Sequence, residues 1–353
     1  MAYTVSGLFL SGLAGAQNLQ ACGGEKGYPA WVKDGVYSGA IGKLPVTLQI
    51  KRGVSDQTAY FYRSYGVDLP LTAFHDGERL ILQESAYNRA ANREFATGCF
   101  RLGRSGAGQA GAGLQGDWTT PDARKKLAVS LAPLNVAGVP LRLAASAGVA
   151  QLRRDSPLTF LKLNRPWQKV PGGLKEPYSG LIFPRPAYAS AALNAFLQDR
   201  QLKYAADVLD CRSQMLGMED EFYFDFQAAP QFQTPHLLSL IEGGEGYCGG
   251  AHPFSMFTPY TVDKQTGKKF QPSDLWPRLT PERLLQLYSR KYKPDFEGTD
   301  GLQTMLTRHG LAIYNDNYPE FNRSVRTFDV TIPYAQLRAE ADPKSPYYRD
   351  LYR

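Results

Sequence analysis

The four histidines are the side chains of this chain best suited to move protons near neutral pH. They are His75, His236, His252 and His309, and no two of them have the spacing of a metal site. His252 is the most interesting, because it follows a glycine pair that lets the backbone approach another group closely. Catalysis would require a carboxylate or a nucleophile beside it, and ligand contact is a further alternative. The simplest interpretation is that its ring nitrogens hold a tight turn between strands.

The four cysteines form a second chemical set, and none of them is in a CxxC pair. Cys22 and Cys99 fall in the first half of the chain, and Cys211 and Cys248 in the second. If each half closes its own pair, the disulfides are Cys22–Cys99 and Cys211–Cys248, one of the three pairings that four cysteines allow. Such bonds persist in oxidising compartments, so this arrangement favours an exported protein over four unrelated buried thiols.

Motifs of the common catalytic chemistries are absent from the sequence, which has no HExxH, GxSxG, SxxK or P-loop pattern. Residues 106–111 satisfy the GxGxxG pattern, but residues 112–118 after them have the pattern of a strand. A dinucleotide site needs a helix that opens at the glycines and an acidic residue about twenty positions later, and none stands near position 131. We therefore expect a glycine-rich hairpin loop, no cofactor, no metal site and no assigned catalytic residue.

The net charge of +7 is concentrated in a short part of the chain. Residues 134–178 hold seven basic and two acidic residues, whereas the regions on either side are nearly balanced. A nucleic-acid-binding protein would show a basic face and a readout motif, and the sequence has neither, so we expect no nucleic-acid partner. A solvated surface is the simpler interpretation of the basic residues. The candidate for a polyanion site consists of Arg153-Arg154, Lys162, Arg165 and Lys169.

The N-terminus has the composition of an export signal, predicted for residues 1–21. Residues 5–16 form an apolar run that is too short to span a bilayer and ends in small residues, as at a cleavage site, although no basic residue precedes the run. This prediction places the protein in the periplasm or outside the cell. In the alternative, Leu19-Gln20-Ala21-Cys22 resembles a bacterial lipobox, and the protein is an envelope lipoprotein anchored to the membrane through an acylated Cys22. That acylation would compete with a Cys22–Cys99 disulfide.

Apolar and polar residues that alternate at every second position predict an antiparallel β domain over residues 28–133. Val46, Leu48 and Ile50, for example, alternate with polar neighbours, which puts one face of the strand inward and the other in water. Glycine turns separate the runs at intervals of roughly ten residues, which is typical of a meander that forms a barrel or a sandwich. A closed barrel would leave no exposed sheet edge. Strands are expected at 46–51, 60–65, 67–73, 79–84, 112–118 and 127–131.

The rest of the chain predicts an ordered basic connector over residues 134–178 and an α+β domain over residues 179–353. Residues 158–163 of the connector have the pattern of a strand. In the second domain, Thr280-Pro281-Glu282 begins a helix, because Thr can cap it and Pro suits its first position. This order of elements favours helices on one face of an antiparallel sheet. We expect helices at 188–209, from 281, and at 302–309 up to Gly310, where His309 interacts with the helix dipole, and strands at 222–226 and 327–332.

Two parts of the chain resemble known bacterial modules. Residues 37–118 resemble a small β-barrel module of envelope proteins, with the motifs Tyr37-Ser38-Gly39-Ala40-Ile41-Gly42, Pro45-Val46-Thr47-Leu48 and Gly116-Asp117-Trp118. Tyr247-Cys248-Gly249-Gly250-Ala251-His252-Pro253 resembles the GGAH signature of the extracytoplasmic domain of the anti-sigma factor RsiV, which also occurs as an accessory module in cell-wall enzymes. Three further motifs of that domain follow in order: Val262-Asp263-Lys264-Gln265-Thr266-Gly267, Ser273-Asp274-Leu275-Trp276 and Asp329-Val330-Thr331-Ile332-Pro333-Tyr334.

The RsiV resemblance implies an extracytoplasmic binding module rather than a signalling protein, because the chain has no sigma-binding segment or transmembrane run. The expected function is that of a non-enzymatic envelope protein that binds peptidoglycan or a protein such as lysozyme, with Tyr247, Gly249, Gly250 and His252 as the ligand-binding residues. The acidic run at 219–221 could also meet a cationic partner such as lysozyme, although a solvated turn is simpler. The alternatives are a cell-wall hydrolase that uses His252 and a purely structural envelope protein.

Overall fold

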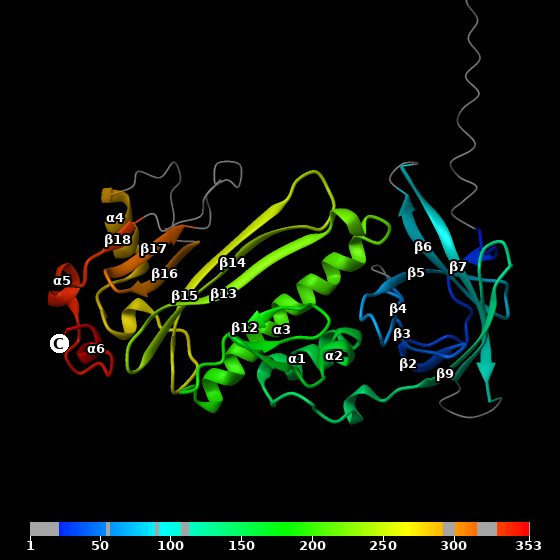
Figure 1. Cartoon of the computed structure of the whole chain (residues 1–353), viewed down its shortest axis with the longest axis horizontal. Coiled ribbons are helices and arrows are strands. Elements are labelled where there is room, and N and C mark those ends of the chain that lie inside the picture. The colour runs from blue at the N-terminus through cyan, green and yellow to red at the C-terminus, as the bar shows by residue number, and fades with distance from the viewer. Residues whose placement is uncertain are drawn as a thin grey trace, which may run out of the picture. The chain divides into compact units, whose positions relative to one another are not determined.

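The computed structural model forms two compact units (Figure 1). Unit 1 consists of residues up to 141 together with 151–164 and 207–222, and unit 2 consists of the remaining segments. The predicted connector is therefore shared between the units, and unit 1 takes a segment from the predicted second domain. The predicted signal at 5–16 and most of the glycine-rich loop lie outside the described residues. The structure describes residues 21–53, 57–88, 92–106, 113–291, 301–315 and 330–352.

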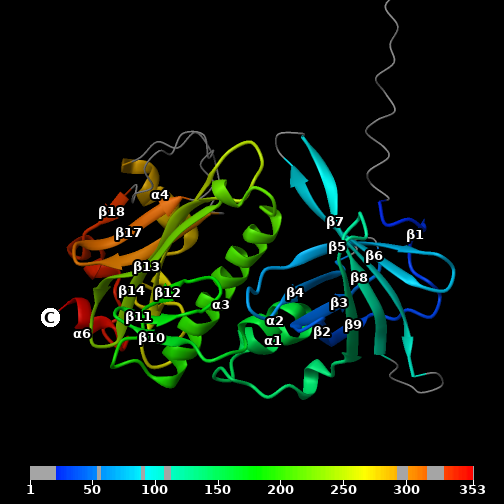
Figure 2. The ribbon, with the colours of Figure 1, turned by 45° about the vertical axis from the view of Figure 1, so that its right-hand side comes forward.

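Unit 1 contains a closed barrel of eight antiparallel strands, β2 to β9 (Figures 1 and 2). Each strand pairs with the next along the chain, and β9 pairs with β2 to close the barrel. The predicted antiparallel barrel is thus confirmed, and a two-residue strand, β1, adds to the edge of β5. The strands are β1 Glu25–Lys26, β2 Gly35–Ile41, β3 Leu44–Ile50, β4 Ala59–Tyr62, β5 Leu69–His75, β6 Leu80–Asn88, β7 Arg93–Ser105, β8 Gly113–Thr119 and β9 Lys126–Pro133.

Two glycines allow the barrel strands to approach one another. A Cβ atom at Gly39 in β2 would lie 1.9 Å from the carbonyl oxygen of Ser130 in β9. A Cβ atom at Gly116 in β8 would lie 1.9 Å from the carbonyl oxygen of Arg101 in β7. Any larger residue at either position would push the neighbouring strands apart, so both glycines are needed for a close backbone approach.

Strand β3 does not follow the simple alternation that its sequence suggests. Thr47 and Gln49 are 2% and 9% exposed, although their positions were expected to face water. The reason is that helix α2 (Pro157–Leu163) packs against β3 and covers its outer face. The strand predicted at 158–163 is therefore wrong: Pro157 occupies the first turn of a helix, the position where proline costs no backbone hydrogen bond.

All four cysteines are oxidised, as the pairing prediction requires. Cys22 and Cys99 form a disulfide with a Cα–Cα distance of 5.5 Å. This bond is buried beside Phe74 and Ile81 on the barrel wall. Cys211 and Cys248 are also in disulfide form. A disulfide-bonded Cys22 has no thiol left for acylation, which disfavours the lipoprotein alternative.

Unit 2 combines three small antiparallel sheets with helices, so the predicted mixture of helices and strands is confirmed. Helix α3 (Ala191–Gln214), whose residues up to 206 belong to unit 2, lies along the second sheet (Figure 2). Its Leu193 and Leu197 pack in one cluster with Leu240 and Val262 of that sheet. The sheets are β10 Gln168–Val170, β11 Gly173–Lys175 and β12 Ile182–Phe183; β13 Tyr223–Gln233, β14 Leu237–Tyr247 and β15 Phe254–Asp263; and β16 Leu302–Thr307, β17 Gly310–Asn315 and β18 Val330–Ile332. The remaining helices are α1 Ala147–Asp155, α4 Pro281–Lys291, α5 Tyr334–Leu337 and α6 Tyr348–Leu351, with 3-10 turns at Val136–Gly138, Glu219–Glu221, Pro272–Asp274 and Arg338–Glu340.

The helix predicted at 302–309 is wrong, because these residues form β16 and the turn into β17. Met305 and Leu306 are both buried, so the strand has apolar residues on both faces. Apolar residues on both faces of a short strand produce the same i, i+3, i+4 spacing as a helix, and six residues are too few to separate the two patterns. His309 therefore lies in an exposed turn, where it accepts a hydrogen bond from Arg308, and not at a helix end. The strand predicted at 327–332 is confirmed over its described part, β18.

Three of the motifs that carry the RsiV resemblance have structural roles in unit 2. Trp276 is fully buried, donates a hydrogen bond to the hydroxyl of Tyr352 at 2.8 Å and stacks on Tyr334. Asp263 organises the turn after β15, accepting hydrogen bonds from the backbone and hydroxyl of Thr266 at 2.6 and 2.9 Å and from the hydroxyl of Tyr347 at 2.9 Å. These side chains stabilise the fold and are not available to a ligand.

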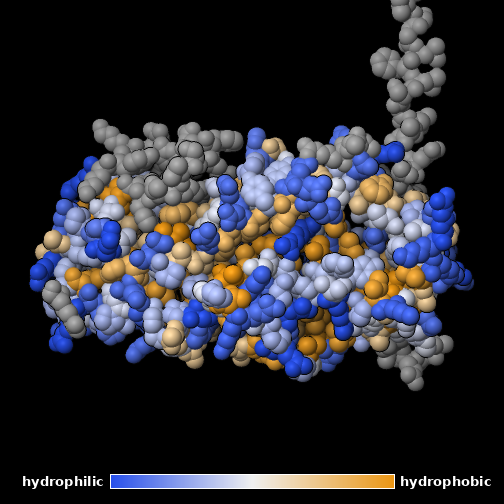
Figure 3. All heavy atoms as spheres, in the orientation of Figure 1, coloured by the Kyte–Doolittle hydropathy of each residue, from blue (hydrophilic) through white to orange (hydrophobic). Residues whose placement is uncertain are grey.

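The helices in the described part of the chain include none that is both long enough and apolar enough to cross a membrane. The longest, α3, carries charged residues along its length, such as Arg200 and Lys203. The face shown in Figure 3 mixes hydrophilic and hydrophobic residues over its whole extent.

The Cys22–Cys99 bond should contribute measurably to stability. The two cysteines are 77 positions apart, and a cross-link over a loop of this length restricts the unfolded chain. We expect the double variant Cys22→Ser/Cys99→Ser to lose roughly 4 kcal/mol of unfolding free energy in urea titrations. An unchanged midpoint and slope would contradict this role.

Asp263 should give the protein a pH-dependent stability. Burial acts to raise its pKa, but the hydrogen bonds from Thr266, Tyr347 and Gln265 hold the pKa below its ordinary value. Its contribution is thus complete above the unfolded pKa of about 4 and disappears as the pH falls through the lower folded value. Asp263→Asn should cost roughly 1–3 kcal/mol at pH 7, and this cost should shrink towards pH 2. The exposed Asp220→Asn is the control, and a cost for Asp263→Asn that does not vary with pH would count against the assignment.

Candidate functional site

The glycine-rich motif forms the exposed loop between β14 and β15. Gly249 and Gly250 have φ values of 87° and 90°, a region that favours glycine. The hydroxyl of Tyr247 donates a hydrogen bond to the carbonyl oxygen of Gly250 at 2.9 Å, which closes the loop. His252 is exposed, and no described residue holds its ring nitrogens. The four predicted ligand-binding residues therefore lie in one loop, but the interpretation of His252 as the holder of a tight turn has no contact to support it.

The other histidines have local partners. Nδ1 of His236 lies 3.0 Å from a carboxylate oxygen of Asp350, which is 1% exposed, and His75 accepts the backbone N–H of Gly77 at its own turn. Among the residues that the structure describes, no three His, Cys, Asp or Glu side chains come close enough to hold a metal ion. None of these arrangements forms a nucleophile, base and acid in hydrogen-bonding sequence.

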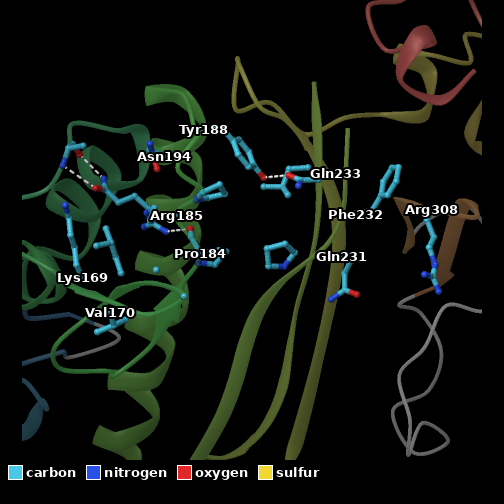
Figure 4. A pocket seen from close by; sticks show the side chains of 18 residues that line it. Lys169, Val170, Pro184, Arg185, Tyr188, Asn194, Gln231, Phe232, Gln233 and Arg308 are labelled. Carbon is cyan, nitrogen blue, oxygen red and sulfur yellow. Dashed lines mark hydrogen bonds between the residues drawn. The ribbon is translucent and has the colours of Figure 1, made fainter. Parts of the chain in front are cut away.

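Unit 2 contains a pocket of about 1090 Å³, which we call the cationic pocket (Figure 4). Its walls come from the β10–β11 hairpin, the segment 184–188, the first part of α3 and the end of β13. Gly173 lets β11 approach β12 closely, because a Cβ there would lie 1.8 Å from the carbonyl oxygen of Phe183. The 18 lining residues are Ala144, Lys169, Val170, Gly172, Gly173, Leu174, Pro184, Arg185, Pro186, Tyr188, Asn194, Gln198, Pro230, Gln231, Phe232, Gln233, Leu238 and Arg308.

The cationic pocket has positive charges and no negative ones in its lining. Lys169, Arg185 and Arg308 are its charged residues, and none of the 18 lining residues is Asp or Glu. Within the described part of the chain, none of the three cations forms an ion pair with a carboxylate. A concave site with one sign of charge concentrates ligands of the opposite sign. The pocket is therefore suited to an anion.

Arg185 is the most rigidly held of these cations. Its guanidinium donates to the carbonyl oxygen of Pro184 and to Oε1 of Gln201, both at 2.9 Å. Gln201 is fully buried and donates in turn to the carbonyl oxygens of Leu174 and Leu181, at 2.8 and 3.0 Å. Burial lowers the pKa of Arg185 to about 10, because no neighbouring carboxylate compensates the removal of its charge from water.

The residue next to Gln201 anchors α3 to the second sheet of unit 2. Nε of Arg200 lies 3.0 Å from each carboxylate oxygen of Glu242 in β14, which is fully buried. The hydroxyl of Tyr260 in β15 donates to the same carboxylate at 2.5 Å. Burial alone would lower the pKa of Arg200, but the Glu242 carboxylate raises it above its ordinary value. Successive residues of one helix thus fix the sheet on one side and Arg185 on the other.

A second hollow of about 450 Å³ lies on one face of the β13–β15 sheet, and Glu242 points to the other face. We call this hollow the sheet groove. Asp225 of β13 and Glu245 of β14 are direct cross-strand partners there, and no Lys or Arg is among its lining residues. Like charges placed directly opposite each other repel. The groove also exposes apolar surface from Ile241 and Phe257.

The structure disperses the predicted polyanion patch. Lys162 is 1% exposed, and its Nζ lies 2.7 Å from Oδ2 of Asp68, so it is neither solvated nor accessible to a ligand. Arg153 donates to the carbonyl oxygen of Val139 at 2.6 Å, and Arg165 lies over the ring of Tyr178. Arg154 pairs with Asp155 at the surface. Only Lys169 of this set lines the cationic pocket.

Arg185 was not among the residues that the sequence singled out. It stands between two prolines and has no motif or charge spacing around it. The only sequence signal was the arginine without a neighbouring acidic residue in an otherwise apolar stretch. Comparison with known proteins found no protein-family model that matches the chain and no curated protein that matches it.

Proposed function

We propose that this chain is a non-enzymatic, exported envelope protein that binds anionic cell-wall polymer, peptidoglycan, through the cationic pocket of unit 2. The observation that carries the proposal is a large pocket with three cations, Lys169, Arg185 and Arg308, and no carboxylate in its lining. Peptidoglycan bears carboxylates on its peptides, so its charge complements this pocket. The resemblance of the second half of the chain to the RsiV extracytoplasmic domain supports the same class of function.

The cysteines support a location outside the cytoplasm. Two disulfides are compatible with the periplasm or the extracellular space, where such bonds persist. With Cys22 in a disulfide, we propose the free exported form rather than the lipid-anchored one. We also propose that helices cover only one face of the β13–β15 sheet, because α3 packs on that face and the sheet groove opens on the other.

The two alternatives to a binding function have less support. A hydrolase that uses His252 would need an acid or nucleophile within hydrogen-bonding distance, and in the described residues His252 has no such neighbour. A purely structural protein would have no reason to hold Arg185 partly buried with only neutral partners, because a charge removed from water without a counter-charge costs stability.

Binding to isolated peptidoglycan sacculi should depend on the three pocket cations. We expect the triple variant Lys169→Gln/Arg185→Gln/Arg308→Gln to lose at least about tenfold in affinity in a co-sedimentation assay, and wild-type binding to weaken with salt. The matched control removes three exposed cations of unit 1, Lys33→Gln/Lys43→Gln/Arg104→Gln, and should bind as the wild type does.

Two results of that assay would contradict the proposal. If the wild-type protein does not sediment with sacculi, the proposed binding to peptidoglycan is excluded. If both triple variants lose affinity equally, the binding is non-specific charge attraction and not recognition by the pocket. Release of soluble muropeptides by the wild type, lost in His252→Ala, would instead establish the hydrolase alternative.

A second candidate function is binding to a cationic protein such as lysozyme at the sheet groove. The specific observation is the cross-strand pair Asp225 and Glu245, whose mutual repulsion a basic partner would relieve. The predicted ligand-binding loop with Tyr247 and His252 continues from the same two strands, β14 and β15. The apolar surface of Phe257 would supply the buried part of such an interface.

Lysozyme binding should therefore depend on the acidic pair of the groove. We expect Asp225→Asn/Glu245→Gln to weaken inhibition of lysozyme in a turbidity-clearing assay by about tenfold or more. Tyr247→Ala and His252→Ala test the loop, and Glu25→Gln/Glu78→Gln, which removes two exposed acidic residues of unit 1, is the matched control and should inhibit as the wild type does. Lysozyme that is not inhibited by the wild type, or that is inhibited equally by the groove variant, would exclude this candidate.

A further inference from the structure

We infer that the cationic pocket recognises the free terminal carboxylate of a peptide, with Arg185 as its anchor. This inference rests on the proposed function, because it states which part of the wall polymer enters the pocket: the stem peptides and not the glycan strands. It follows from the way Arg185 is held, from the absence of a competing acid in the lining, and from the amide-rich walls around it.

The guanidinium of Arg185 has donors left for a ligand after its structural bonds are made. An arginine side chain carries five N–H groups in a planar fork, and the bonds to Pro184 and Gln201 use two of them. Gln201 is itself fixed by two backbone carbonyls, so the fork is oriented before a ligand arrives. A planar fork matches the two oxygens of a carboxylate and can bind both at once.

The surroundings of Arg185 strengthen an interaction with an anion. The side chain is partly buried and lies 5.9 Å from the ring centroid of Trp167, so bulk water screens it incompletely. No acidic residue in the lining competes for it. The lowered pKa of Arg185 reports the same missing counter-charge, which a ligand carboxylate would supply.

The remaining walls suit a peptide better than a sugar. Gln231 is the extra residue of a β-bulge in β13, where the pairing with β14 shifts between Pro230 and Phe232. A bulge redirects its side chain, and Gln231 lines the pocket (Figure 4). In the described residues β13 pairs with a strand on one side only, so its free edge can offer backbone hydrogen bonds to an extended peptide. Gln233 and Asn194 add side-chain amides that are bonded at one end, Oε1 of Gln233 to Tyr188 and Nδ2 of Asn194 to Ala189, and that can pair with peptide groups at the other.

The test uses the full chain and a peptide with a single carboxylate. The probes are Nα-acetyl-Lys-D-Ala-D-Ala, the same peptide as its terminal carboxamide, and a tetramer of N-acetylglucosamine, with affinities measured by calorimetry. We expect the acid to bind at least tenfold more tightly than the amide, and the sugar not to compete with it. Acetate and inorganic phosphate are competitors that distinguish a peptide site from a general anion site, and neither should displace the peptide at equimolar concentration.

Variants assign the effect to Arg185. Arg185→Gln should remove the difference between acid and amide, and Arg185→Lys, which keeps the charge but not the fork, should retain only part of it. Lys33→Gln, which removes an exposed cation outside the pocket, should leave the ratio unchanged. Thermal melts of each variant establish that it is folded, and the comparison of acid with amide on the wild type does not depend on any variant.

The outcomes separate this inference from the function on which it rests. Equal affinity for acid and amide, a ratio that survives in Arg185→Gln, or displacement of the peptide by the sugar, acetate or phosphate overturns the inference even if sacculi still bind to the pocket cations. A chain that does not bind sacculi overturns the proposed function itself.

Discussion

Unit 2 depends on one buried ion pair, the contact between Arg200 of α3 and Glu242 of β14. A fully buried carboxylate is tolerated only when its oxygens are paired and hydrogen-bonded, and here Arg200 and Tyr260 meet that requirement. Because the geometry must be satisfied, α3 has one position and rotation on the sheet. Gln201, the next residue, then necessarily points to another side of the helix, where it holds Arg185. The position of Arg185 in the cationic pocket thus depends on the Arg200–Glu242 contact, which does not itself line the pocket.

The barrel shows how much local pattern can establish when one physical constraint acts on every strand. Period-two alternation and glycine turns were sufficient to predict six of its eight strands, because each strand has one face in the core; β2 and β7 were not predicted. Gly39 and Gly116 could be recognised as motif residues, but their role in close strand approach required the structure. One exception was β3, whose outer polar residues Thr47 and Gln49 are buried by a helix from a distant part of the sequence. Such coverage leaves no signal in the strand itself.

The errors in the second half of the chain have a common cause, which is short length. Residues 158–163 and 302–307 each carry several apolar residues in fewer than eight positions, and periods of 2 and 3.6 cannot be separated over that range. Pro157 was the available sign of a helix start, and the β-branched Thr304 and Thr307 were the available signs of a strand. The candidate site shows the same limit more strongly. The loop with Gly249 and His252 could be found because it is contiguous in sequence, whereas the cationic pocket is defined by residues that meet from seven separate stretches of the chain.

The ion pairs inside the molecule explain why Arg185 is a stronger sign of a binding site than the exposed His252. Lys162 is paired with Asp68 and Arg200 with Glu242, so these two cations have a counter-charge built into the fold. Arg185 is also held in place by hydrogen bonds, one of them to the buried Gln201, but both of its partners are neutral. A neutral partner orients a guanidinium without consuming its charge, which is the arrangement that a binding site needs and a structural ion pair does not. An exposed His252 requires no such explanation, because water solvates it at no cost to the fold.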